Sequence, residues 1–166
     1  MRYVTIVLAA LAAFACASAG AHHADPSANV KTAVRVFLEK MGEGRFDRLD
    51  EIYGPGFVAH GAGRDYTLDE DNASGKQWRA AFPDLKVFVL RTVGDESHVA
   101  VHWRATGTNT GAVAGFPGQG AKATLEGMTF FRFDDGRIVE EWSMLDMDAL
   151  RAQLKPPPAV TFEKPK

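Results

Sequence analysis

The chain has 166 residues, a formal net charge of −2 and a single cysteine. One cysteine excludes a disulfide scaffold and a cysteine-based zinc site. The slightly acidic balance argues against nucleic acid as the main partner, because a phosphate-binding face shows as a basic excess. The length fits one domain with a single core.

The first 21 residues have the anatomy of a secretory signal peptide. A short basic start is followed by an apolar stretch up to Ala15, and small residues then allow cleavage after Ala19 or Ala21, of which we favour Ala21. The apolar stretch is shorter than the ~20 residues that span a bilayer. We therefore expect a secreted or periplasmic protein with no membrane segment after cleavage. The only cysteine, Cys16, leaves with the leader, and a lipid anchor on it is the less favoured alternative.

The amino-terminal half predicts three helices. Residues 22–29 are expected to be a flexible segment in which Asp25-Pro26 offers a helix start. One apolar stripe at helical spacing follows, and its members are Val30, Val34, Phe37, Leu38 and Met41. Gly42 and Gly44 end this helix. A short helix is expected over 47–53, a break at Gly54-Pro55-Gly56, an extended piece over 57–61 and a third helix over 68–82.

The carboxy-terminal half predicts two β-hairpins and a short last helix. Strands are expected over 86–93 and 98–106, and again over 124–133 and 137–145, where Asp135-Gly136 is a strong hairpin signal. The glycine-rich loop 107–120 lacks the Lys-Ser/Thr ending of a phosphate loop. A helix up to Leu154 precedes a proline-rich tail, 156–166, which we expect to be disordered. This order predicts one α+β domain over 30–155, with helices on the concave face of a curved antiparallel sheet.

Side chains alternate between the two faces of a strand, so each hairpin turn predicts which residues share a face. If Asp135-Gly136 form the turn, the more apolar face, which should meet the helices, carries Thr129, Phe131, Phe133, Ile138, Glu140, Trp142, Met144 and Asp146. If Asp95-Glu96 form the other turn, the inner face carries Phe88, Leu90, Val99, Val101, Trp103 and Ala105. His102 then lies on the outer face. A slip of one residue reverses these assignments.

Taken in order, several segments resemble the SnoaL-like polyketide cyclase (ester cyclase) family of the nuclear transport factor 2-like superfamily. The matching stretches are Phe57-Val58-Ala59-His60-Gly61, Ala81-Phe82-Pro83-Asp84-Leu85, Val99-Ala100-Val101-His102-Trp103, Thr106-Gly107-Thr108-Asn109-Thr110-Gly111, and the run from Asp135 to Asp146. The resemblance covers nearly the whole mature domain and implies a cone-shaped fold. It also implies an acid/base aspartate at the end of the Glu-x-Trp strand, which here is Asp146, and a pocket residue at His60.

An inner-face carboxylate in an apolar cavity loses solvation, which raises its pKa and suits it to proton transfer. Asp146 is therefore our candidate catalytic acid/base, and an N-cap of the last helix is the alternative interpretation. His60 is the second candidate, either as an acid/base group or as a donor to an oxyanion, with a loop histidine bonded to backbone as the alternative. The candidate ligand contacts, for which plain core packing is the alternative, are Trp78, Trp103, Trp142, Thr129, Phe57 and Phe116.

These observations together predict an exported enzyme that needs neither metal nor cofactor. It would act by acid/base catalysis, in a cyclisation, isomerisation or hydrolysis, on a small hydrophobic carbonyl compound. We expect a homodimer through the outer sheet face. Two alternatives stay open, a non-catalytic domain that binds a small hydrophobic molecule and a protein-interaction module of the same fold.

Overall fold

The computed structural model describes residues 26–61 and 63–154, so the predicted leader (1–21) and the tail (156–166) lie outside the described residues. The elements, in chain order, are α1 (Pro26–Arg35), the π-helix η1 (Val36–Glu43), the 3-10 helix η2 (Leu49–Glu51), β1 (Tyr53–Gly61), β2 (Arg64–Tyr66), α2 (Leu68–Ala81), β3 (Lys86–Gly94), β4 (His98–Asn109), β5 (Ala121–Asp134), β6 (Arg137–Leu145) and α3 (Met147–Gln153). Helix α1 thus begins inside the segment predicted to be flexible.

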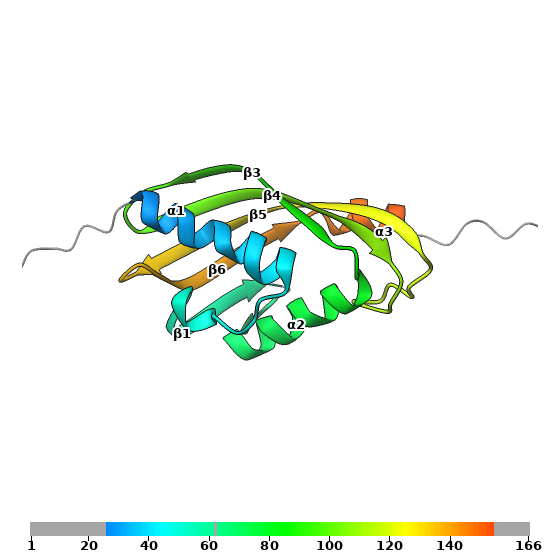
Figure 1. The fold of residues 1–166 in the computed structure, drawn as a ribbon, viewed down its shortest axis with the longest axis horizontal. Helices are drawn as coiled ribbons and strands as arrows, with labels where there is room; N and C mark the ends of the chain where they lie inside the picture. The colour runs from blue at the N-terminus through cyan, green and yellow to red at the C-terminus, as the bar shows by residue number, and fades with distance from the viewer. Residues whose placement is uncertain (1–25, 62, 155–166) are drawn as a thin grey trace, which may run out of the picture.

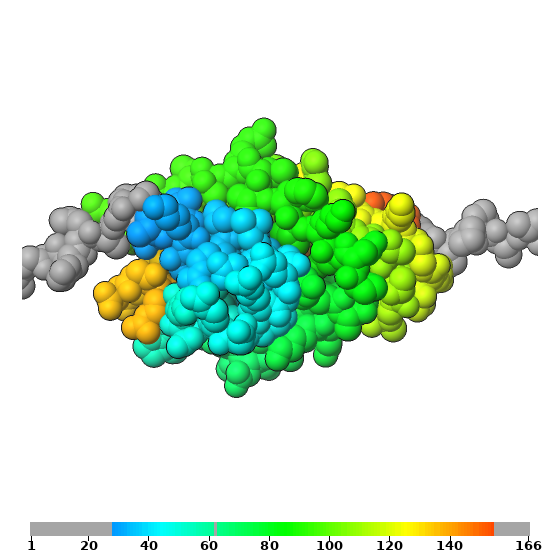
Figure 2. Space-filling view, viewed as in Figure 1, coloured from blue at the N-terminus to red at the C-terminus, as the bar shows by residue number. Residues whose placement is uncertain are grey.

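Within residues 26–61 and 63–154, six strands form one sheet in the order β2-β1-β6-β5-β4-β3. Figure 1 shows the curvature of this sheet. The α+β class is confirmed, but the sheet is mixed, because β1 and β6 run parallel. The helix predicted over 47–53 is shorter, since only η2 forms there. Gly54-Pro55-Gly56, predicted to break that helix, belong to β1, and the pairing of β1 with β6 is irregular between Tyr53 and Val58. The amino-terminal helices lie across one face of the sheet, and in Figure 2 their blue and cyan atoms cover the middle of that face. None of the described helices is long and apolar enough to cross a membrane.

The helices that cover the sheet are defined by local signals in the sequence. The inward positions of α1 and η1 are Ala33, Val36, Phe37 and Lys40, which follow one another at helical spacing. The predicted stripe is wrong at Leu38, whose side chain is 43% exposed. Gly44, in the left-handed conformation with φ 75°, ends η1. In α2, Thr67 and Glu70 form a reciprocal capping box at the start of the helix.

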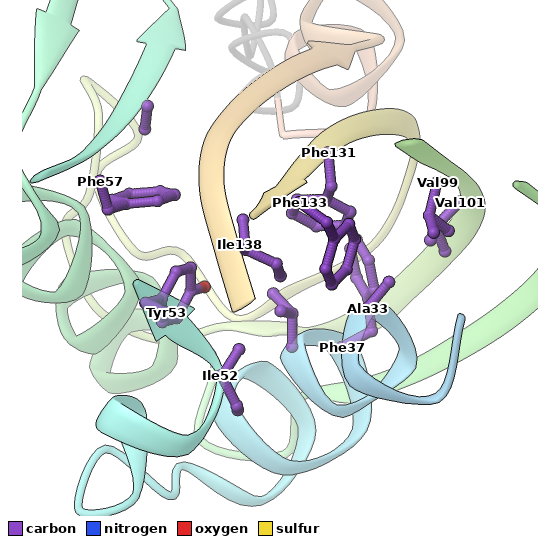
Figure 3. Packing of buried hydrophobic residues seen from close by; sticks show 12 residues of the cluster. Ala33, Phe37, Ile52, Tyr53, Phe57, Val99, Val101, Phe131, Phe133 and Ile138 are labelled. Atoms are coloured by element: carbon purple, nitrogen blue, oxygen red, sulfur yellow. The ribbon is translucent and has the colours of Figure 1, made fainter. Parts of the chain in front are cut away.

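The main core lies between these helices and the concave side of the sheet. Figure 3 shows side chains from α1, η1, β1, β4, β5 and β6 pointing toward a common interior. Phe37 contacts Trp103 and Phe131, with ring centroids 5.4 and 6.1 Å apart. Val99 and Val101 of β4 are fully buried, as their predicted inner positions require. Burial of this apolar surface is the main force that holds the helices on the sheet.

Two β-bulges change which residues face the helices. In β6 the pairing shifts between Phe133↔Ile138 and Arg132↔Glu140, so Val139 is an extra residue. A bulge inserts one residue and switches the faces of all residues after it. The predicted inner positions of Glu140, Trp142 and Met144 are therefore wrong, and Glu141 and Ser143 point inward in their place.

The second bulge lies in β3. Val89 pairs with Trp103 and Arg91 pairs with His102, which leaves Leu90 unpaired between them. The predicted inner positions of Phe88 and Leu90 are wrong for this reason, since Phe88 is 48% exposed and the side chain of Val89 packs against the core. His102 lies on the outer face, as was predicted by alternation from a turn at Asp95-Glu96.

Candidate functional site

A cavity of about 190 Å³ opens between the helices and the concave face of the sheet. Four aromatic side chains line it, namely Phe37, Trp78, Phe82 and Trp103. Its polar lining residues are Lys40, Asp71, Ser74, Thr106, Thr129, Glu141 and Ser143. A mostly apolar hollow with a few convergent polar groups is the usual form of a small-molecule site.

A chain of hydrogen bonds runs along the sheet wall of the cavity. The indole Nε1 of Trp103 donates to Thr129 Oγ1 at 3.0 Å, Thr129 and Ser143 are joined by their hydroxyls at 2.9 Å, and Ser143 Oγ donates to Glu141 Oε1 at 2.9 Å. A hydroxyl group has one hydrogen to donate. Because Ser143 donates its hydrogen to Glu141, Thr129 is the donor in its contact with Ser143. Glu141 Oε2 has no hydrogen-bond partner among the described residues and can therefore meet a ligand.

Glycine at position 127 makes room for this chain. Gly127 of β5 pairs with Trp103 of β4, and a Cβ atom built on it would lie 2.6 Å from Trp103 Cζ2. Real Cβ contacts are essentially never that short. The absence of a side chain on Gly127 therefore lets the indole lie against β5 and reach Thr129.

Burial first, and the negative charge of Asp71 second, raise the pKa of the Glu141 carboxyl from 4.5 to about 7, against the opposing effects of Lys40 and of the hydrogen bond from Ser143. A carboxyl group with a pKa near neutrality exchanges protons readily at physiological pH. Glu141 is thus a candidate acid/base group of the cavity.

Lys40 and Asp71 form an ion pair at the helical side of the cavity. Lys40 Nζ lies 2.5 Å from Asp71 Oδ2 of α2 and donates to the hydroxyl of Tyr53, at 2.9 Å. The side chain of Lys40 is only 2% exposed. The pKa of Tyr53 is raised well above its usual value, chiefly by burial and then by Glu141 and Asp71. Tyr53 therefore remains a neutral phenol beside the ion pair.

Asp146 lies outside this cavity. Its side chain is exposed and accepts a hydrogen bond from the backbone N–H of Ala149 at 2.9 Å, which makes it the N-cap of α3. The predicted inner-face position of Asp146 is wrong because the bulge at Val139 shifts the register of β6. The contacts of Asp146 agree with the alternative interpretation, an N-cap of the last helix.

His60 and Trp142 lie on the opposite face of the sheet from the cavity. Their rings stack with centroids 4.7 Å apart. His60 Nδ1 lies 2.7 Å from Asp65 Oδ1, and Nε2 is 3.9 Å from Glu140 Oε1. Glu140 in turn pairs with Arg132 at 2.5 Å, which lowers the pKa of the Glu140 carboxyl. The structure therefore does not bring His60, Trp142 and Asp146 together with the cavity.

The other predicted ligand contacts divide into two groups. Trp78, Trp103 and Thr129 line the cavity, and their contact with a ligand stays a prediction. Phe57 packs edge-on against Tyr53 in the main core, and Phe116 packs against Trp78 with centroids 6.3 Å apart. Phe116 is buried and holds the glycine-rich loop against α2, so both phenylalanines serve the packing around the cavity.

Sequence reasoning missed Glu141, Lys40 and Asp71. Lys40 carried a usable signal, because it follows Val36 by four residues and Phe37 by three and so occupies an inward helical position. Glu141 carried none, since only the bulge turns it inward. Within the described part of the chain, no group of three or more His, Cys, Asp or Glu side chains could hold a metal ion.

The model of the SnoaL-like polyketide cyclase family matches residues 31–154. Comparison with curated proteins gives no match.

Among solved structures, a candidate SnoaL-like polyketide cyclase from Jannaschia is 25% identical, with a TM-score of 0.71 over 80% of this chain and 95% of that one. The candidate polyketide cyclase IdmH from Streptomyces antibioticus is 26% identical, with a TM-score of 0.67 over 76% of this chain and 97% of that one. The candidate hydroxylase AclR from Streptomyces galilaeus, at 20% identity and a TM-score of 0.71 over 78% of this chain and 97% of that one, shares the fold. The family match spans most of the chain, and the chain therefore belongs to the SnoaL-like polyketide cyclase family of the nuclear transport factor 2-like superfamily.

Proposed function

We propose that this protein is an exported, cofactor-free enzyme that transfers a proton on a small hydrophobic carbonyl compound, with Glu141 as the acid/base group. The observation that carries the proposal is the Glu141 carboxyl, which lines a mostly apolar cavity and has a pKa of about 7. Near neutral pH the ionised form can accept a proton and the protonated form can return it.

The chemistry follows from the free oxygen of Glu141. Oε2 accepts a proton from the carbon next to the ligand's carbonyl group. The electron pair of the broken C–H bond forms a carbon–carbon double bond, and the π pair of the carbonyl group moves onto its oxygen to give an enolate. The enolate carbon can then close a ring by attacking a second carbonyl, whose oxygen takes the proton from Glu141. Where a double bond is conjugated with the enolate, a carbon further along takes the proton from Glu141 instead, and the double bond shifts. Cyclisation and isomerisation share this first step. The two cyclase candidates at 25% and 26% identity support this class of reaction.

Cavity size favours a compact substrate. An engineered apolar cavity of ~150 Å³ in another protein holds benzene. The cavity here, at about 190 Å³, suits a single ring or a small fused ring system. Its aromatic walls, among them Trp78 and Trp103, offer stacking surfaces for such a ligand.

Two further parts of the proposal concern the whole protein. The amino-terminal leader supports export to the periplasm or medium.

The outer sheet face supports a homodimer, because Met128, Phe130, Trp142 and Met144 lie there with 37% to 76% of their area exposed. Exposed apolar patches of this kind mark interaction sites.

A binding protein without catalysis is the second candidate. It is favoured by the hydrogen-bond chain from Trp103 to Glu141, which fixes the polar groups of the cavity as a rigid binding site would require. In that case a ligand would bind and leave with its hydrogens unchanged.

Hydrogen exchange on a model ketone separates the two candidates. The protein is incubated with 2-indanone in D2O, and proton NMR follows the replacement of the hydrogens next to the carbonyl. We expect the wild type to accelerate this exchange and Glu141→Gln to lower the rate by about 100-fold or more. Glu140→Gln is the matched control, because Glu140 is the adjacent residue on the opposite face. Binding of 2-indanone by the wild type without exchange would support the binding protein and reject the enzyme.

A further inference from the structure

The ion pair beside the cavity contains a lysine, Lys40, with more N–H donors than acceptors among the described residues. Lysine carries three N–H donors. The structure gives Lys40 two acceptors among the described residues, Asp71 Oδ2 at 2.5 Å and Tyr53 Oη at 2.9 Å. Lys40 also lines the cavity. The third N–H is therefore available to a ligand in the cavity.

Burial makes this lysine an effective donor. Its side chain is 2% exposed, and lysine is almost never fully buried unless it is paired. The Asp71 carboxylate holds the ammonium group from one side, and the hydroxyl of Tyr53 holds it from a second side. A hydrogen bond from a charged group in a site shielded from water is stronger than one at the surface.

The charges around the cavity also favour an uncharged ligand over an anionic one. Lys40 contributes one positive charge and Asp71 one negative charge, so these two cancel. Glu141 adds zero or one negative charge, depending on its proton. No cationic side chain other than Lys40 lines the cavity among the described residues. An anionic ligand would therefore meet no net positive charge, whereas an uncharged carbonyl compound needs only one donor.

We infer that Lys40 is a further catalytic residue, which donates a hydrogen bond to the carbonyl oxygen of an uncharged ligand and stabilises the enolate oxygen formed there. This inference rests on the proposed function, whose base is Glu141. When Glu141 takes the proton, its negative charge disappears and one negative charge appears on the enolate oxygen. The net charge of the site stays constant, and Lys40 is the positive group that stabilises the new negative charge on the enolate oxygen.

The test reads the hydrogen bond without relying on turnover. 2-Indanone labelled with carbon-13 at the carbonyl is bound to the protein, and its carbonyl resonance is compared between variants. We expect a downfield shift on binding to the wild type and to Asp71→Asn, both of which keep Lys40. We expect this shift to be lost in the double variant Lys40→Met/Asp71→Asn, with at least about ten-fold weaker binding. The double variant leaves no unpaired buried charge, so it is the variant that should fold.

Lys76→Met is the matched control, because Lys76 is an exposed lysine of α2 that does not line the cavity. An unchanged carbonyl shift in the double variant, or no shift in the wild type, would overturn the inference. Should the double variant fail to fold, nitrogen-15 NMR of lysine-labelled wild type gives the answer, since the Lys40 Nζ resonance must move when the ketone binds.

The two proposals fail separately. Loss of the carbonyl shift without Lys40, together with normal exchange in Glu141→Gln, would keep the hydrogen bond and reject Glu141 as the base. Exchange that depends on Glu141, with a carbonyl shift that does not depend on Lys40, would keep the proposed function and reject Lys40.

Discussion

Glu141 makes the stability of the protein depend on pH. Its pKa is raised from 4.5 to about 7 in the folded state, first by burial and second by Asp71. Between these two values the folded protein binds more protons than the unfolded chain. The free energy of unfolding therefore falls as the pH rises through this window and levels off above it.

Glu141→Gln should remove this dependence. Between pH ~5 and pH ~8 we expect the wild type to lose ~2–3 kcal/mol of unfolding free energy relative to the variant, because an amide does not ionise. Urea denaturation at both pH values measures the difference. Glu140→Gln serves as the control, since the Glu140 pKa is lowered by Arg132 and that carboxylate is ionised throughout the window. Identical pH dependence in the wild type and Glu141→Gln would refute the raised pKa.

Gly127 offers a second test at the scale of one residue. Gly127→Ala should push the Trp103 indole away from β5 and break its hydrogen bond to Thr129, because the new Cβ would lie 2.6 Å from the ring. We expect about 1–3 kcal/mol of destabilisation and an altered near-ultraviolet signal from tryptophan. Gly136→Ala is a comparison at an uncrowded site, although its φ of 71° adds backbone strain. A Gly127→Ala protein with unchanged stability and tryptophan spectrum would show that the close packing is not required.

At the scale of elements, alternation along a strand predicts which face a residue occupies only where no bulge intervenes. The inner positions of Val99, Val101 and Trp103 follow from alternation along an uninterrupted β4. Glu141 and Asp146 follow the bulge at Val139, and no signal in the sequence marks an extra residue there, because Ile138 and Val139 are both buried apolar residues. The cone, the hairpins and part of the cavity wall were predictable, but the carboxylate that faces the cavity was not.

Lys40 and Asp71 join η1 to α2, so their pair can be tested as a link between elements. Lys40→Met should destabilise the protein by about 3–5 kcal/mol, because Asp71 is left without its partner. The double variant Lys40→Met/Asp71→Asn should recover much of that loss. Thermal or urea unfolding of the single and double variants gives the coupling energy. Additive effects of the two substitutions would mean that the ion pair does not couple η1 to α2.

At the scale of the whole molecule, the outer face of the sheet is apolar and could bind a second copy of the chain. Met128 and Met144 are cross-strand neighbours there, and so are Phe130 and Trp142. We predict that the double variant Met128→Lys/Met144→Lys is a monomer and that the wild type is a dimer, since four lysines would meet across a two-fold interface. Sedimentation velocity measures both. Leu38→Lys, an exposed position on η1, is the control that should remain a dimer. A wild type that sediments as a monomer would exclude this interface.

The proposed function depends on the carboxyl group of Glu141 in the cavity, and NMR can titrate that group directly. The carboxyl carbon of Glu141 is identified in carbon-13 glutamate-labelled protein as the resonance that Glu141→Gln lacks, and its chemical shift is followed against pH. We predict a midpoint of about 7, which 2-indanone should perturb on binding. A midpoint near 4.5, unaffected by the ketone, would contradict the role of Glu141 as the acid/base of the cavity.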